Sequence, residues 1–244
     1  SEAYRALVRS FYVGLAGLQS GEDVRAKDGL TQATQVAPGE AASWANLAIL
    51  SVRQQKLDGA FQQADKARSL VPQSSRVEQL LGDIESRRGN PAQAIAHLKR
   101  AVELDPKNLK AVFMLAEQTE RQGDDASAGQ ALQWFEQARK LAPENTAVLL
   151  EVARLAAKTN QAAVLQEVLT ILDRQSPAWP EEVRQQMQKL RQAASGNPGA
   201  AALQVAFLRN TLLRVPDYRL ALGAAKTPPV VVGDPFLKLL SAVP

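Results

Sequence analysis

Proline recurs along most of this chain at a nearly constant interval. The positions are Pro38, Pro72, Pro106, Pro143 and Pro177, so successive intervals are 34, 34, 37 and 34 residues. Within one interval, Val77, Leu81 and Ile84 recur at helical spacing, and Gly89-Asn90-Pro91 separates a first helix from a second. A fixed period of this length predicts helical hairpins that each stack on their neighbours.

Small residues occupy matching places in successive intervals. Ala60, Ala64 and Ala67 line one second helix, and Ala94 and Ala101 line the next. Such residues let neighbouring helix backbones approach closely while larger side chains fill the remaining space. With the turn glycine and the closing proline, this pattern resembles the tetratricopeptide repeat (TPR) family over about residues 7–177. The resemblance implies an all-α fold, a right-handed TPR superhelix (α-solenoid) of about five helix-turn-helix repeats.

The predicted repeats form an array over residues 1–177. Their approximate bounds are 7–40, 41–74, 75–108, 109–145 and 146–179. Three repeats depart from the pattern. The first lacks an aromatic residue near its start, as terminal repeats often do. In the fourth, extra residues around Gly123 to Gly129 predict a longer exposed turn, with a ligand loop as the alternative. In the fifth, Asn160 stands where glycine is preferred.

The period ends after Pro177. We predict a degenerate helical hairpin or cap over 178–225, with helices to about Ser195 and over about 198–215. Residues 226–244 are predicted to be an extended tail or linker, in which Phe236, Leu237, Leu239 and Leu240 favour a small apolar helix. The tail either packs on the last helices as a linker or docks on a groove, its own or a partner's.

The composition excludes several kinds of chemistry. The chain has no cysteine and one histidine, so thiolate catalysis and cysteine-bound zinc are ruled out. That histidine, His97, is predicted to lie at the surface. Acidic pairs such as Glu181-Glu182 are typical of helix starts. We therefore expect a chain that is not an enzyme and has no cofactor and no metal.

Charge and hydropathy exclude further classes. Lys and Arg number 29 against 25 acidic residues, and the two signs are interleaved, which disfavours nucleic-acid binding. No apolar run approaches the roughly 18 residues of a membrane span. The remaining expectation is a protein or peptide partner, and the sequence predicts no particular oligomeric state.

The resemblance implies that first helices line a concave groove. Arg53, Arg87, Arg121 and Lys158 hold one place in four successive repeats, Arg76, Lys110 and Arg154 lie on the same side, and Ile49, Phe113 and Leu150 add apolar contacts. We call the first four residues the basic ladder. Guanidinium groups suit carboxylates, so these residues predict an acidic peptide, with complementation of helix dipoles as the alternative. The carboxylate clamp of some family members is not reproduced, because its positions hold Ile49, Asp83, Glu117 and Arg154.

A narrower resemblance concerns the N-terminal run YRALVRSFYVGLAGL and the later AFLRNTLLRVPDYR. Together with the tail, they are similar to the N-terminal TPR region of exported bacterial proteins that also carry FG-GAP propeller repeats. This implies an extracytoplasmic module of a longer protein. The chain begins in helix-forming sequence without a signal pattern, so it is either cytoplasmic or a mature product. The predicted function is a non-catalytic scaffold that binds protein or peptide in the concave groove. The alternative is a structural spacer or self-association module.

Overall fold

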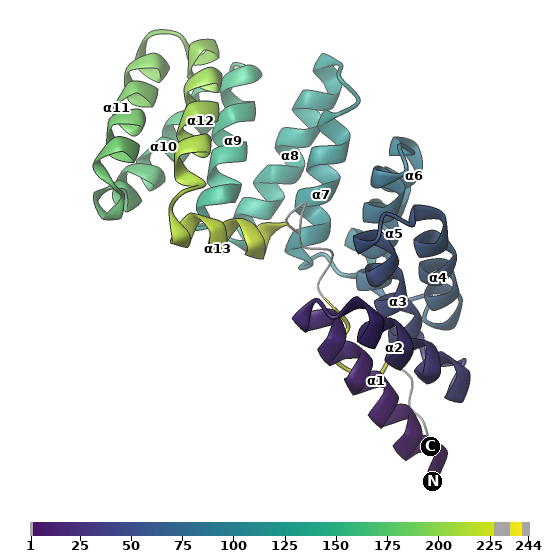
Figure 1. The fold of residues 1–244 in the computed structure, drawn as a ribbon. Coiled ribbons are helices and arrows are strands. Elements are labelled where there is room, and N and C mark those ends of the chain that lie inside the picture. The colour runs from purple at the N-terminus through teal and green to yellow at the C-terminus, as the bar shows by residue number, and fades with distance from the viewer. Residues whose placement is uncertain (1, 227–234, 241–244) are drawn as a thin grey trace. The chain divides into compact units, whose positions relative to one another are not determined.

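The computed structural model describes residues 2–226 and 235–240, and every regular element in this part of the chain is a helix (Figure 1). The α-helices are α1 (Glu2–Ser20), α2 (Asp23–Val36), α3 (Ala41–Arg53), α4 (Leu57–Leu70), α5 (Ser75–Arg87), α6 (Pro91–Leu104), α7 (Leu109–Glu120), α8 (Asp125–Leu141), α9 (Thr146–Lys158), α10 (Ala162–Gln175), α11 (Glu181–Gly196), α12 (Pro198–Leu212) and α13 (Pro216–Ala225), with a 3-10 turn η1 (Ser176–Ala178). The all-α prediction is confirmed.

The chain divides into two compact units. The first contains residues 1–106 together with 227–244, and the second contains residues 107–226. The described tail segment, residues 235–240, therefore belongs to the first unit although it follows the second in sequence. The predicted boundaries of repeats, cap and tail stay a prediction, and residues 227–234 and 241–244 of the tail lie outside the described residues.

One backbone feature marks the turn inside each predicted repeat. A residue with positive φ follows the first helix at Gly21 (79°), Gln55 (60°), Gly89 (80°), Gly123 (88°) and Asn160 (57°). These positions keep the intervals of the sequence period. A residue in the left-handed conformation after a helix allows the last carbonyl groups of the helix to accept hydrogen bonds. Glycine adopts this conformation without strain. The geometry is thus kept at Gln55 and Asn160, where the glycine is absent.

Close backbone approach shapes the hairpins of the first unit. A Cβ atom added to Gly29 would lie 2.5 Å from the backbone nitrogen of Gly14, so α1 and α2 touch through their main chains. A Cβ on Gly82 would lie 2.6 Å from Leu98 Cγ. The alanines predicted to line α4 are buried. Small residues at these places therefore permit the spacing on which the larger apolar side chains pack.

The structure corrects the fourth repeat. The longer turn that the sequence predicts is wrong, because the extra residues lie within α8, which has 17 residues where α6 has 14. Asp124 caps this helix, and its Oδ1 accepts from Ser127 N at 2.5 Å. Hydrogen bonds from the backbone and side chain of Ser127 lower the pKa of Asp124. Because the cap begins the helix early and buried Ala131 and Phe135 hold it, the insertion adds nearly one helical turn.

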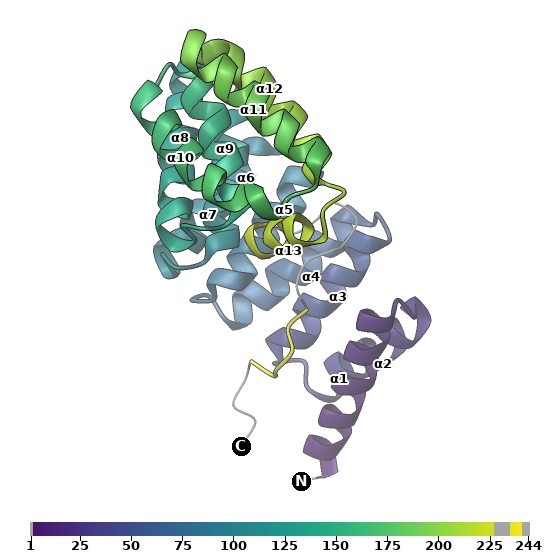
Figure 2. The same cartoon turned by 90° about the vertical axis from the view of Figure 1, so that its left-hand side faces the viewer.

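Helices α12 and α13 do more than cap the end of the array, because they also pack along earlier helices of the second unit. Helix α12 packs against α11 and α9, and α13 packs against α9 and α7 (Figures 1 and 2). Helices α7 and α9 are the first helices of the fourth and fifth repeats. The C-terminal helices of the second unit therefore cover the face on which the sequence predicts a groove. The predicted helix start at Glu181 is confirmed, and the second helix ends at Leu212, short of the predicted end.

Candidate peptide-binding groove

The first unit holds a segment of its own chain against α3 and α5. Asn46 on α3 is buried, and its side-chain amide pairs with the main chain of Phe236 (the yellow trace in Figure 2). Asn46 Nδ2 donates to Phe236 O at 3.0 Å, and Phe236 N donates to Asn46 Oδ1 at 2.7 Å. This pairing satisfies a donor and an acceptor on each side, and it does not depend on the bound side chain.

Two charged residues bind the main chain on either side of that pair. Glu40 Oε1 accepts from Leu240 N at 2.8 Å and also from Ala42 N at 2.9 Å, which makes it the N-cap of α3. Arg76 on α5 donates from Nη2 to Pro235 O at 3.1 Å. The main chain of residues 235–240 is therefore held at Pro235 and Phe236 at one end and at Leu240 at the other, much as a bound peptide would be.

The side chain of Phe236 anchors the segment. It is 2% exposed and belongs to the apolar core of the first unit, which also contains Ile49, whereas Leu237 is 53% exposed. The Arg76 guanidinium carbon lies 4.2 Å from the centroid of the Phe236 ring. Burial of such a ring stabilises by about 1.5–3 kcal/mol, and a cation–π contact by about 0.5–1 kcal/mol. Burial is the larger effect.

Two expectations about the tail are wrong. The apolar helix is absent from residues 235–240, because Phe236 N and Leu240 N donate to Asn46 and Glu40 and so do not form helical bonds. The segment also does not pack on the last helices, since Phe236 and Leu239 lie against the apolar core of the first unit. Residues 235–240 contact Asn46, Glu40 and Arg76 of the same chain, and a groove at this place stays a prediction.

In the first unit, the basic ladder is engaged within the chain. Arg53 donates to Asp23 Oδ1 at 3.0 Å and to Leu18 O at 2.6 Å, which ties α3 to the preceding hairpin. Arg87 donates to Asp83 on its own helix at 3.0 Å. An acidic ligand would have to compete with these carboxylates.

In the second unit, Arg154 is the centre of a carboxylate cluster. It donates to both Glu120 oxygens, at 2.8 and 2.6 Å, and to Glu151 Oε2 at 2.9 Å. Burial opposes its charge, but these carboxylates outweigh that effect and raise the pKa of Arg154. The bonds from Arg154 lower the pKa of Glu120. Lys158 Nζ lies 3.5 Å from Glu120 Oε1.

The other predicted groove residues divide into surface and core. Arg121 is exposed just after α7, and Lys110 is half-buried near the start of that helix. Ile49, Phe113 and Leu150 are all buried; Ile49 belongs to the same apolar core as Phe236, and Lys226 Nζ lies 5.9 Å from the centroid of the Phe113 ring. Their place in the groove stays a prediction. Phe113 packs edge-on against Phe135, with ring centroids 4.9 Å apart.

The covered face of the second unit uses positions equivalent to those that bind the tail segment. Following the repeat intervals, Glu151 corresponds to Asn46, and Asn145 corresponds to Glu40. Glu151 accepts from Arg209 of α12 at 2.7 Å, and Asn145 donates to Ala221 O of α13 at 2.8 Å. The same places on the first helices therefore contact C-terminal segments in both units.

Neighbouring contacts close that face further. Lys226 Nζ donates to Glu117 at 2.6 Å. Tyr218 of α13 is buried, and this burial raises the pKa of its hydroxyl. Four further apolar residues of α12, Ala201, Val205, Leu208 and Leu212, are also buried. The second unit thus covers its first helices with packed secondary structure.

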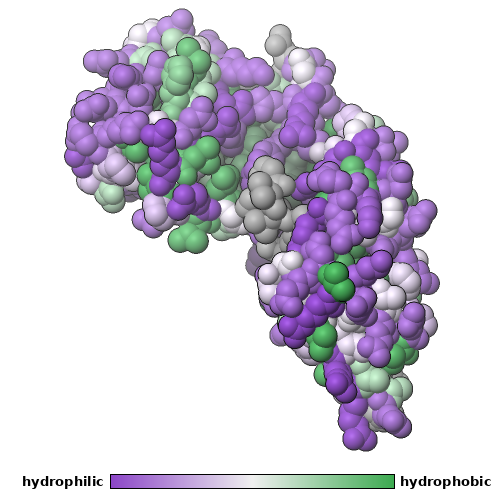
Figure 3. All heavy atoms as spheres, in the orientation of Figure 1, coloured by the Kyte–Doolittle hydropathy of each residue, from purple (hydrophilic) through white to green (hydrophobic). Residues whose placement is uncertain are grey.

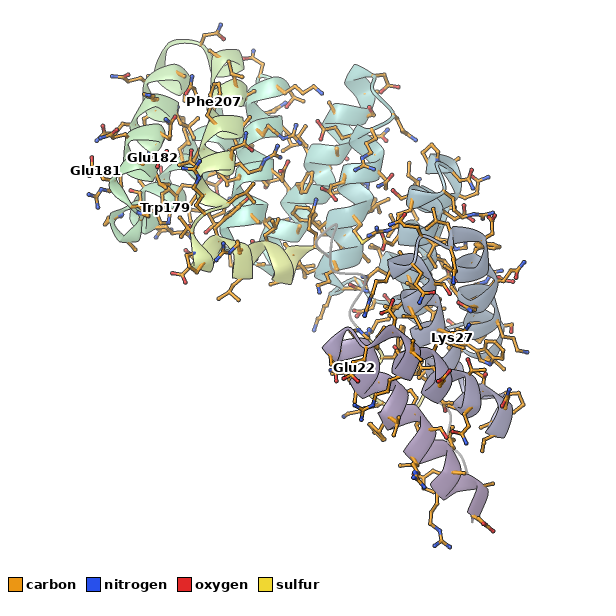
Figure 4. The ribbon with its side chains drawn as sticks, viewed as in Figure 1. Glu22, Lys27, Trp179, Glu181, Glu182 and Phe207 are labelled. Atoms are coloured by element: carbon orange, nitrogen blue, oxygen red, sulfur yellow. The ribbon has the colours of Figure 1, made fainter. Side chains whose placement is uncertain are left out.

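The structure also places the residues considered for chemistry. His97 is half-buried, so it is less exposed than predicted, and its Nδ1 lies 2.7 Å from Oε2 of buried Glu78, which needs a polar partner. Glu181 and Glu182 lie together at the start of α11 (Figure 4). Glu181 bonds Arg184, and this bond lowers its pKa. Among the residues described, no cluster of three or more His, Cys, Asp or Glu side chains could hold a metal ion.

Helix α12 exposes two apolar side chains one helical turn apart, Leu203 and Phe207. Phe207 is labelled in Figure 4, and Figure 3 shows hydrophobic surface in this region. None of the described helices has both the length and the apolar character of a membrane span. Asn46 and Glu40 are site residues that sequence reasoning missed. The available signal was an asparagine between Ala45 and Leu47 in a mostly apolar helix, since a buried amide needs partners.

Comparison with known proteins agrees with this architecture. Residues 76–117 match the family model described as tetratricopeptide repeat. A search of curated proteins by sequence finds no match. Among solved structures, PilF of Pseudomonas aeruginosa is 20% identical with a TM-score of 0.67, covering 91% of this chain and 99% of PilF. The fold class is therefore a TPR α-solenoid.

Two further structures share the fold. PilW, described as a widely conserved type IV pilus biogenesis factor, is 17% identical with a TM-score of 0.63, covering 88% of this chain and 98% of its own. YrrB, described as a TPR protein with an unusual peptide-binding site, is 18% identical with a TM-score of 0.54, covering 66% and 82%. At these identities the likeness concerns the fold. The resemblance to proteins with FG-GAP repeats stays a prediction.

Proposed function

We propose that this chain is a non-catalytic scaffold that binds an extended segment of another protein in the groove formed by α3 and α5. The observation that carries the proposal is the pairing of the Asn46 amide with both main-chain polar groups of Phe236. A buried amide placed in this way binds extended main chain. The described peptide-binding site of YrrB, which shares the fold, supports the same reading.

The basic ladder supplies an electrostatic part of the proposal. Arg53 and Arg87 are the last residues of the groove helices α3 and α5, and Arg76 contacts the tail segment directly. Acidic residues flanking a bound peptide would be attracted to these guanidinium groups. Because Asp23 and Asp83 already pair with two of them, the gain in affinity is modest.

The test is a library of random peptides displayed against the full chain, with selected peptides measured by fluorescence anisotropy. We expect selected peptides to bind the native chain and to lose affinity for Asn46→Asp, which keeps the shape and the acceptor but removes the Nδ2 donor. Gln93→Glu is the matched control, since it makes the same amide-to-carboxylate change on an exposed face of α6. Absence of any binding peptide, for the native chain and for a Phe236→Ala variant alike, would overturn the proposal.

A second candidate is a structural spacer or self-association module. The observation in its favour is that α12 and α13 already cover the first helices of the second unit, while α12 exposes Leu203 and Phe207. Sedimentation over a range of concentrations tests it. A mass that rises with concentration, and that falls in Phe207→Glu, would favour this candidate, whereas a constant monomer mass would reject self-association.

A further inference from the structure

We propose that the groove at Asn46 selects extended segments in which an aromatic residue is followed three positions later by leucine. We further propose that residues 235–240 occupy it in cis as a competitor of such a segment from another protein. The inference rests on the proposed function and adds to it the ligand class and a regulating element. The groove residues that carry the inference are Asn46, Glu40 and Arg76.

The contacts divide into a part that any peptide could make and a part that only some could make. Asn46, Glu40 and Arg76 bond main-chain atoms of Phe236, Leu240 and Pro235. Every peptide has such groups, so these bonds set the extended conformation and the direction of the ligand. Selection among sequences must come from the side chains.

The side chains of the segment differ in exposure in a way that defines a motif. Phe236 is buried in the core and Leu239 packs against it, while Leu237 and Lys238 are exposed. The chain bends at Lys238, which returns Leu239 to the protein. The groove therefore contacts the side chains at the first and fourth positions, Phe236 and Leu239, and does not constrain the two residues between them.

Arg76 explains why the first of these positions calls for an aromatic ring. Its guanidinium group stacks over Phe236, and its Nη2 donates to the carbonyl of Pro235, so one side chain holds both the ring and the preceding main chain. A leucine could fill the pocket, but it offers no π face to the cation. We thus expect phenylalanine to be preferred over leucine at this position.

The tail is suited to competition because its described contacts fall within six residues and are mostly main-chain bonds. A segment attached to the same chain has an effective concentration that can reach the order of millimolar. A free segment of the same chemistry therefore has to compete with the tail. Removing the anchor ring from the tail is expected to raise the affinity for a free peptide by about tenfold or more.

The experiment uses the labelled peptide GDPFLKLLSA, which copies residues 233–242, and the full chain carrying Phe236→Ala. We expect this variant to bind the peptide at least about tenfold more tightly than the native chain does. The matched control is Leu237→Ala, which removes an exposed side chain from the same segment and should bind like the native chain. Asn46→Asp combined with Phe236→Ala should abolish binding.

Variant peptides test the motif. Alanine in place of the phenylalanine or of the leucine three positions later should abolish binding, and leucine in place of the phenylalanine should weaken it. Alanine at the first leucine, the counterpart of Leu237, should have no effect. A peptide whose affinity survives loss of its aromatic residue would overturn the motif.

Three results would overturn the proposed competition between the tail and a free segment. Equal peptide affinity of the native and Phe236→Ala chains would show that the tail is no competitor. A native dimer that becomes monomeric in Phe236→Ala would show that a second copy supplies the segment in trans. Failure of GDPFLKLLSA to bind, while library peptides of other sequence bind through Asn46, would reject this inference and leave the proposed function standing.

Discussion

The two units of this chain cover the same face of their first helices in different ways. In the first unit, Asn46 and Glu40 bond the main chain of a short extended segment. In the second, the equivalent Glu151 and Asn145 bond the packed helices α12 and α13. The extended cover adds a few hydrogen bonds and one buried ring, whereas the helical cover adds the buried apolar side chains of Ala201, Val205, Leu208, Leu212, Tyr218 and Ala225. We infer that a ligand can replace the first cover and that the second is structural.

The largest effect should come from the core of the helical cover. Leu208 of α12 is fully buried, at 0% exposure, and Leu208→Ala should destabilise the second unit by about 2–5 kcal/mol because it leaves a cavity. Leu203→Ala is the control on the same helix, since Leu203 is 60% exposed and its loss should change stability by less than about 0.5 kcal/mol. Chemical denaturation measures both. Similar values for the two variants would remove the distinction between a structural and a replaceable cover.

A smaller effect is expected from the extended cover. Phe236→Ala should lower the stability of the first unit by no more than about 3 kcal/mol, the contribution of one buried ring. It should also abolish protection from hydrogen exchange at the amides of Phe236 and Leu240. Mass spectrometry of exchanged peptides measures this loss, with Leu237→Ala as the control. Global unfolding of the first unit in Phe236→Ala would contradict a replaceable segment.

Next in size is the carboxylate cluster of the second unit. Bonds from Arg154 lower the pKa of Glu120 below its ordinary value of 4.5. The stabilisation is therefore complete above that value and is lost as the pH falls through the lowered pKa. Glu120→Gln should cost about 1–2 kcal/mol near neutral pH, in keeping with a lost charged hydrogen bond, and this difference should shrink below pH 4.5.

The pH series needs a control at an exposed pair. Glu103, which pairs with Arg100 on the surface of α6, serves here. Glu103→Gln should show nearly constant stability relative to the native chain over the same pH range. A Glu120→Gln difference that does not change with pH would mean that its carboxylate contributes nothing through its charge.

The smallest effect concerns the basic ladder, and it sharpens the comparison directly. Arg87→Gln in the first unit should weaken binding of a peptide with acidic flanks by about twofold to fivefold at low salt, and the loss should vanish at high salt. Lys158→Gln removes the equivalent charge from the second unit, where helices cover the face. The Lys158→Gln chain should bind the peptide as tightly as the native chain does. If both variants lost the same affinity, the contribution of the basic ladder would not depend on what covers the first helices.

The sequence predicted the repeats well because a period is a property of the chain itself. Proline spacing, turn residues and small residues each carry local information, and the positive φ of Asn160 follows the period even without glycine. The insertion of the fourth repeat was harder. The same residues are compatible with a longer loop and with an additional turn of helix. The N-cap at Asp124 and the packing around Phe135 favour the helix.

The site was predicted less completely than the fold. Register alone placed Arg76 on the groove, where it contacts the tail segment. The sequence did not predict a role for Asn46, because that role depends on Phe236, which lies 190 residues further along the chain. The helical pattern assigned Ile49, Phe113 and Leu150 to the groove, and their full burial depends on neighbours that such a pattern does not reveal.

By itself, the sequence determined that this chain folds as stacked helical hairpins, since each hairpin is specified by residues close together in the chain. The tertiary structure alone decided what covers the first helices: an extended segment in one unit and two helices in the other. Segments distant in sequence meet only after folding, and the bonds of Asn46 and Glu151 are made with such segments. Local residue patterns carry the energy of helices and turns, whereas the cover of a groove depends on which distant groups satisfy its buried polar atoms.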